Sequence, residues 1–184
     1  LSWYKFKHHY MDFVKVLLGI VAFEGLILYI QDKGFLKDFE TTRMTLFLLL
    51  FSTSLLIVVQ NSIYISKERS VLNRDFFSGL SRSAFALASM GIHAFFAVLE
   101  TIVFILSYSV FSKFFDKEFP DAGHIFGSYR WEVGITVLLV FLASHFIALF
   151  ISALVGKSEI TSVILAVIVG IMQFSLRSEE HTSE

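Results

Sequence analysis

Residues 133–155 read VGITVLLVFLASHFIALFISALV and contain no Asp, Glu, Lys or Arg. A helix of about 20 apolar residues is long enough to cross the ~30 Å hydrocarbon core of a bilayer. Backbone groups in lipid must be bonded within the segment, and this stretch lacks the polar-inward alternation of a barrel strand. It therefore predicts a membrane-spanning helix.

Four other apolar stretches flank this one, at residues 14–30, 44–65, 83–111 and, shorter than the rest, 160–174. The predicted fold class is all-α, a polytopic transmembrane bundle of about five apolar helical segments. Residues 83–111 are longer than one crossing requires and shorter than two straight crossings. The sequence leaves open whether they form one tilted helix or a tight hairpin.

The composition excludes several classes of protein. The chain has 184 residues, of which 55% are hydrophobic and 22 are Phe, and its mean hydropathy is +0.71. Such a chain has too little polar surface for a water-soluble globule. A formal net charge of −1 gives no basic face for nucleic acid. The absence of cysteine from the sequence excludes a thiolate metal or redox site.

Positive charge predicts the orientation, because Lys and Arg collect in short cytoplasmic loops. Lys5, Lys7 and Lys15 precede or begin the first span, and residues 67–82 hold four basic residues against two acidic ones. We therefore expect the N-terminus and residues 67–82 to be cytoplasmic. No signal-peptide pattern follows Leu1, so the chain is expected to begin within a longer protein.

Residues 67–82, KERSVLNRDFFSGLSR, join the second span to the third. Read as a helix, Leu72, Phe76 and Leu80 recur every four residues and form one apolar stripe. This predicts a short amphipathic helix on the cytoplasmic face. Such a helix either lies in the headgroup layer or docks its stripe onto a soluble partner, and periodicity alone leaves both open.

The order of residues in this region resembles a known family. The stretches NSIYISKER at 61–69, NRD at 73–75 and SGL at 78–80 resemble the cytoplasmic loop of ABC exporter membrane domains of the G-subfamily type and their bacterial relatives. Asp75 stands where that family usually carries Glu. The resemblance extends more loosely over residues 146–176, where Gly156-Lys157-Ser158-Glu159 is similar to the turn after the family's fifth span.

The resemblance implies a permease domain over residues 1–176, incomplete at its ends, followed by a non-native or disordered polar tail at 177–184. It implies that residues 67–82 form a coupling helix against a nucleotide-binding domain. The residues expected to make that contact are Lys67, Glu68, Arg69, Arg74, Asp75, Phe76 and Gly79.

The nucleotide-binding partner is expected to be fused upstream or to be a separate chain, and to bind ATP and Mg itself. The sequence Gly156-Lys157-Ser158 lacks the earlier glycine of a phosphate-binding loop, so no cofactor is expected in this chain. The resemblance also implies a homo- or heterodimer in the cell membrane, and a transport component that is not itself an enzyme.

Ionisable residues also occur at membrane depth, at Glu24, His93, Glu100 and His145. A charged carboxylate at the bilayer centre costs ~2.5–3.5 kcal/mol, so such residues normally face a cavity or pair with a neighbour. His93 and Glu100 are seven residues apart and share a face if their helix is continuous. Glu24, His93 and Glu100 are candidates for a polar translocation path, and satisfaction within the bundle is the alternative.

No catalytic or metal site is predicted. His8 and His9 are adjacent and point apart on a helix, and no Gly-x-Ser-x-Gly elbow occurs. A membrane-embedded sensor or scaffold without transport activity remains the alternative function. An intramembrane enzyme that uses Glu100 with His93 ranks behind both.

Overall fold

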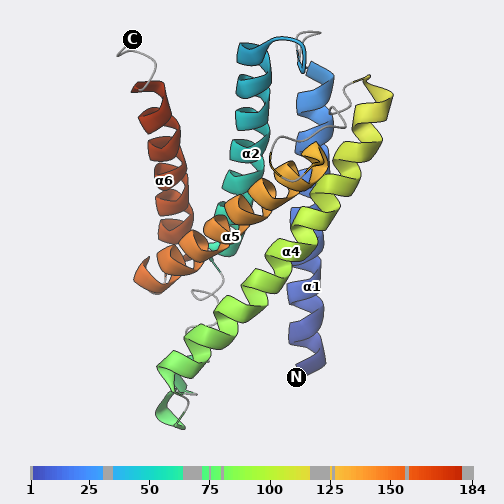
Figure 1. The fold of residues 1–184 in the computed structure, drawn as a ribbon. Coiled ribbons are helices and arrows are strands. Elements are labelled where there is room, and N and C mark those ends of the chain that lie inside the picture. Colours follow the sequence, from blue (N-terminus) through green and yellow to red (C-terminus); the bar gives the residue numbers. More distant parts are fainter. Residues whose placement is uncertain are drawn as a thin grey trace. The chain divides into compact units, whose positions relative to one another are not determined.

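The structure, a computed structural model, describes residues 2–30, 35–63, 72–74, 76–79, 81–116, 125, 127–155 and 158–179. Within these ranges there is no strand, and five helices account for most of the residues (Figure 1). They are α1 (Ser2–Ile30), α2 (Phe39–Asn61), α4 (Arg82–Phe114), α5 (Tyr129–Val155) and α6 (Glu159–Glu179). The predicted all-α class is confirmed.

Four of these helices are long and apolar enough to cross a membrane. The candidate spans are Met11–Ile30, Phe39–Asn61, Arg82–Phe114 and Tyr129–Val155. The apolar part of α6, Glu159–Met172, is shorter than these. The helix α1 begins at Ser2, well before the expected start of the span at Val14, because helical hydrogen bonding continues beyond the apolar segment.

The stretch that the sequence left ambiguous forms one uninterrupted helix, α4, of 33 residues (Figure 1). The hairpin alternative is therefore wrong. At 1.5 Å per residue α4 is about 50 Å long, well beyond the ~30 Å hydrocarbon core. A helix of this length tilts in the bilayer or extends out of it.

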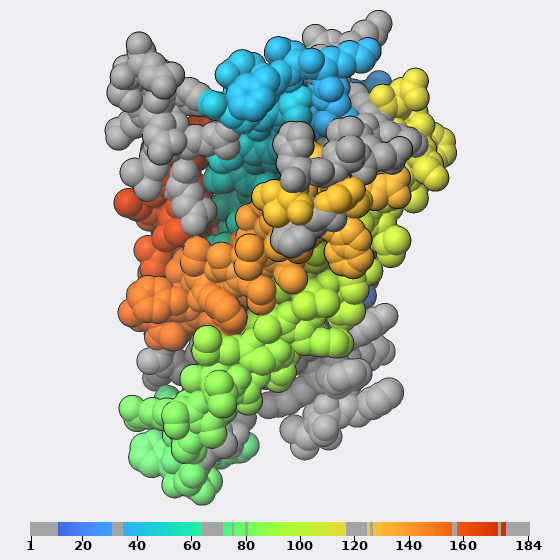
Figure 2. Space-filling model, in the orientation of Figure 1, coloured from blue at the N-terminus to red at the C-terminus, as the bar shows by residue number. Residues whose placement is uncertain are grey.

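The helix α4 carries its polar residues on its buried side and apolar residues on its exposed side. Most of the buried positions are polar or small: Ser89, His93, Ala97, Glu100, Thr101, Phe104, Tyr108 and Ser112. The exposed positions include Leu87, Phe95, Val98, Ile102, Leu106 and Val110. Figure 2 shows the surface of α4 in green to yellow. A water-soluble helix has the opposite pattern. The arrangement is that of a membrane helix whose polar groups face the bundle interior.

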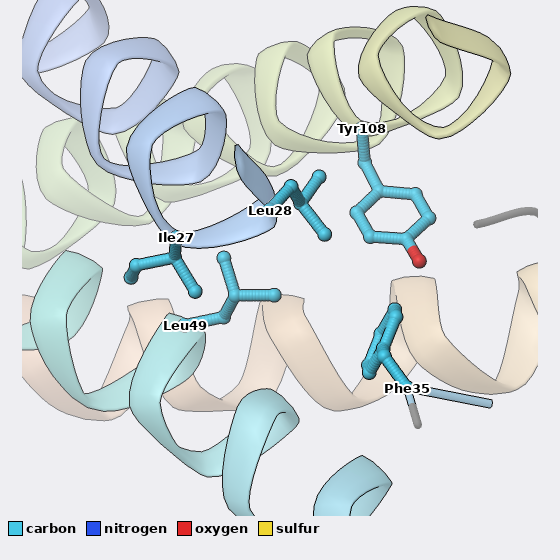
Figure 3. Close-up of a cluster of buried hydrophobic side chains, with 5 residues drawn as sticks. All are labelled: Ile27, Leu28, Phe35, Leu49 and Tyr108. Carbon is cyan, nitrogen blue, oxygen red and sulfur yellow. The ribbon is translucent and has the colours of Figure 1, made fainter. Parts of the chain in front are cut away.

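The chain divides into two compact units, and α2, α4 and α5 each contribute to both. Unit 1 comprises Leu1–Leu56 and Phe96–Phe141. Its core contains Ile27 and Leu28 from α1, Leu49 from α2, Tyr108 from α4 and Phe35 from the α1–α2 connection. These side chains point toward one another in Figure 3.

Unit 2 comprises Ile57–Phe95 and Leu142–Glu184. Its core joins the end of α2, the end of α5 and the middle of α6 through Val58, Ile151 and Ala166. The helix α6 continues to Glu179, so residues 177–179 of the expected polar tail are helical. Residues 180–184 lie outside the described part of the chain.

Candidate functional site

Glu24 is fully buried in unit 1, on α1. The Ser107 hydroxyl, on α4, donates a hydrogen bond to Glu24 Oε2. Its other carboxyl oxygen, Oε1, is buried and has no hydrogen-bond partner among the described residues. Burial of a polar atom without a hydrogen bond costs free energy. The hydrogen bond from Ser107 offsets part of the cost of burying this carboxyl group.

The helices α1 and α4 approach closely beside this contact. A Cβ atom added at Gly25 would lie 3.1 Å from the ring of Phe111. Farther along α1, the rings of Phe13 and Phe96 stack with their centroids 4.7 Å apart. Small residues let helix backbones approach in a membrane, where lipid gives no hydrophobic drive for association. Gly25 therefore permits the spacing at which Glu24 meets Ser107.

His93 and His145 form a second buried polar contact, within unit 2. Both side chains are at most 1% exposed, and their Nδ1 atoms lie 3.0 Å apart. Because the contact joins one nitrogen to another, one Nδ1 must carry the hydrogen and the other must accept it. The pair thus links the first half of α4 to the second half of α5.

Glu100 is also buried, at 1% exposure, on the interior side of α4. The helix is continuous, so the seven-residue spacing does place His93 and Glu100 on its buried side. The two residues belong to different units, however, Glu100 to unit 1 and His93 to unit 2. His93 is paired with His145, which gives no support to a catalytic pair of Glu100 with His93.

The segment between α2 and α4 is helical at residues 72–74 and 76–77. Leu72 is buried, and the Phe76 ring meets the Phe85 ring edge to face at a centroid distance of 5.9 Å. Arg74 is exposed, and Phe77 is 95% exposed. Leu72 and Phe76 of the predicted apolar stripe thus pack within unit 2, while Arg74 and Phe77 face outward, and the third stripe residue, Leu80, lies outside the described residues.

Gly79 ends this helical turn. The Ser78 N–H donates to the Arg74 carbonyl at 3.1 Å, and the Gly79 N–H donates to the Phe76 carbonyl at 3.2 Å. Gly79 has φ +103°, which glycine adopts more readily than any other residue. Ser81 then caps the N-terminus of α4, since its Oγ accepts from the Ala84 N–H at 3.0 Å.

Four of the predicted contact residues, Lys67, Glu68, Arg69 and Asp75, lie outside the described residues. Among the residues that are described, no group of three or more His, Asp or Glu side chains is placed to hold a metal ion. Ser107 was not predicted as a site residue. Its position in the sequence gives one signal. Ser107 lies seven residues, or about two helical turns, after Glu100, so the two residues share a face of the helix.

These features define a polytopic helical membrane protein whose polar groups face inward and whose short amphipathic segment joins two spans. A family model described as ABC-2 type transporter matches residues 4–175, and the chain therefore belongs to that family. It is the membrane-spanning component of an ABC transporter, as the resemblance in residues 61–80 indicates. Membrane domains of this family work with ATP-binding cassette partners, generally as dimers.

No curated protein matches the chain, and no solved structure matches it either. The family assignment therefore depends on the family model.

Proposed function

We propose that this chain lines the translocation path of an ATP-driven exporter and that residues 67–82 couple it to a nucleotide-binding domain. The partner is fused upstream or is a separate chain, and it binds ATP and Mg. Residues 1–176 serve as the membrane domain of a homo- or heterodimer in the cell membrane. The N-terminus and residues 67–82 are cytoplasmic.

The observation that carries the proposal is the division of the coupling segment into two sides. Leu72 and Phe76 pack toward the membrane helices, and Phe76 contacts Phe85 in the first turn of α4. Arg74 and Phe77 remain exposed on the other side. A short helix that is fixed to a span on one side and open on the other can transmit a push as rigid-body motion.

The buried polar side of α4 supports the proposed path. His93 and Glu100 both lie on that side, and Glu24 reaches α4 through Ser107. Polar groups are costly in lipid and mark substrate pathways in many membrane proteins. We propose Glu24, His93 and Glu100 as path residues, whose exposure changes as the transporter alternates between inward and outward openings.

A charge reversal on the exposed side tests the coupling. Arg74→Glu in the full transporter, reconstituted with its ATPase, should leave basal ATP hydrolysis in place but abolish its stimulation by transport. Arg130→Glu, an equal charge change at the start of α5, serves as the matched control and should leave the stimulation intact. Unchanged export by the Arg74→Glu transporter would count against coupling through this segment.

A second experiment tests the path separately from the coupling. Glu100→Gln keeps the size and hydrogen-bonding capacity of the side chain and removes its charge. Reduced export, with the ATPase still bound, is expected for a residue on the path. If export and substrate-stimulated hydrolysis both stay at the native level, Glu100 is a structural residue. Failure of any ATPase to co-purify would favour the sensor or scaffold alternative.

A further inference from the structure

Unit 2 contains an open groove beside the coupling segment. The groove has a volume of about 610 Å³, within the range of small-molecule binding sites. Three parts of the chain line it: Leu72, Asn73 and Phe76 of the coupling segment, the first turns of α4 from Arg82 to Met90, and the end of α5 from Phe146 to Ala153.

The lining of the groove is mostly apolar, and Asn73, Ser89 and Arg82 are its polar members. Phe85, Phe146, Leu149 and Phe150 are among the apolar residues. Arg82 is the one charged residue among the described lining residues. Its guanidinium carbon lies 5.8 Å from the centroid of the Phe76 ring, a cation–π distance that keeps the charge beside the groove.

The end of α4 at Arg82 adds further positive potential. Arg82 is the first residue of α4, and the N-terminus of a helix carries a partial positive charge from its unpaired N–H groups. The Ala84 N–H donates to Ser81 Oγ at this end. Positive charge from the side chain and from the helix thus coincides at the mouth of an apolar groove.

We propose that this groove binds an acidic phospholipid, with its phosphate at Arg82 and an acyl chain along the groove toward α5. The charge of the groove selects an anionic headgroup, and its apolar lining selects a hydrocarbon tail. Lipid is also the solvent that surrounds α4 and α5, so the ligand is always available to this surface. A water-filled apolar groove of this size is unfavourable by comparison.

The site has a consequence for the coupling segment. A lipid in the groove contacts Leu72 and Phe76 on one side and α4 and α5 on the other. It therefore holds the coupling segment against the spans through apolar contacts that the chain alone leaves open. Acidic lipid is expected to stabilise the protein, independently of whether the segment docks onto an ATPase.

The test uses the full transporter, purified in detergent and titrated with phosphatidylglycerol or phosphatidylcholine. Native mass spectrometry counts the lipids retained, and the unfolding temperature reports their effect. Phosphatidylglycerol should be retained more strongly than phosphatidylcholine. Arg82→Gln should weaken phosphatidylglycerol retention about five-fold, the effect of one basic residue at an anionic membrane surface. Retention of phosphatidylcholine should weaken less, because its choline cation offsets the charge of its phosphate.

Two controls sharpen the result. Arg130→Gln removes an equal charge elsewhere and should retain phosphatidylglycerol as the native protein does. Ala153→Phe narrows the groove without changing charge and should weaken retention of both lipids. Equal retention of phosphatidylglycerol by the native and Arg82→Gln proteins would overturn the proposal. Loss of the preference for phosphatidylglycerol on addition of inorganic phosphate would also overturn it, because the site would then bind a free anion. A disulfide cross-link between two copies of the Phe146→Cys protein would overturn it too, because a second copy would then fill the groove.

Discussion

His93 on α4 and His145 on α5 face each other through their Nδ1 atoms at 3.0 Å, although 52 residues separate them in the sequence. Both rings are buried, and one ring donates while the other accepts. Hydrogen bonds between membrane helices contribute about 0.6 kcal/mol on average and up to about 1.7 kcal/mol. We therefore expect this contact to make a measurable contribution to the free energy of association of the two helices.

A double-mutant cycle on His93→Leu and His145→Leu tests this contact. Each single change removes the hydrogen bond between the rings and keeps one buried imidazole, whereas the double change removes both rings. The double variant should therefore be less destabilised than the sum of the singles, by about 1 kcal/mol. The measurement is the free energy of unfolding in mixed micelles with increasing SDS. A parallel cycle of His93→Leu with Phe146→Leu, next to His145 on α5, should show additive effects, and equal coupling in the two cycles would contradict the paired arrangement.

The Glu24–Ser107 contact predicts an asymmetry between single and double substitutions. Ser107→Ala removes the hydroxyl that donates to a fully buried carboxyl group, so the free energy of unfolding should fall by about 1–3 kcal/mol. Glu24→Leu combined with Ser107→Ala replaces both partners by apolar groups and should restore most of that loss. The same micelle titration measures both.

Ser109→Ala is the matched control on the same helix. The Ser109 hydroxyl donates to the Ile105 carbonyl at 2.8 Å, within α4 itself, so its loss should change stability by no more than about 0.5 kcal/mol. A loss at Ser109 as large as at Ser107 would show that the stability depends on hydroxyl groups in general and not on the buried carboxyl group.

The close approach of α1 to α4 gives a third prediction. Gly25→Leu places side-chain atoms against the Phe111 ring and should destabilise the protein by about 1–3 kcal/mol. A Cβ atom added at Gly91 meets nothing within 4 Å, so Gly91→Leu should be neutral or stabilising, since leucine favours helix more than glycine does. The unfolding temperature in detergent compares the two variants. An equal decrease for both would argue that helix α1 is not packed against Phe111.

The fold was predictable where hydropathy alone determines it. Residues 133–155 carry no Asp, Glu, Lys or Arg, and they lie within α5 as expected. The single helix α4 was not predictable, because the length of an apolar stretch does not show whether the chain forms one helix or a hairpin. Gly91 lies in the first third of α4 and does not interrupt the helix. The apolar stretch at residues 14–30 lies within α1, which begins earlier because helical hydrogen bonding does not depend on hydropathy.

The polar residues of the interior were predictable one by one, but their partners were not. Glu24, His93 and Glu100 are conspicuous in apolar segments, and all three are buried. Ser107 is unremarkable in a helix, and the distance in sequence from His93 to His145 conceals their contact. Pairing depends on how the helices pack, which a single sequence does not record.

The proposed orientation of the spans can be tested by cysteine labelling on either side of α4. Residues 72–77 lie before α4 and residue 125 lies after it, so a single crossing by α4 places them on opposite sides of the membrane. Residues 1–184 contain no cysteine, so a cysteine introduced into them gives a site-specific signal over this part of the chain. Phe77 and Ile125 are 95% and 79% exposed, respectively, and both are accessible to a label.

Labelling of these two positions by a membrane-impermeant maleimide tests whether residues 67–82 are cytoplasmic and whether α4 crosses the membrane once. We expect Phe77→Cys to be labelled only after the cells are permeabilised, and to be protected from the label when the ATPase partner is bound. Ile125→Cys should be labelled on intact cells. Labelling of Phe77→Cys from outside intact cells, or labelling of both positions from the same side, would contradict this orientation.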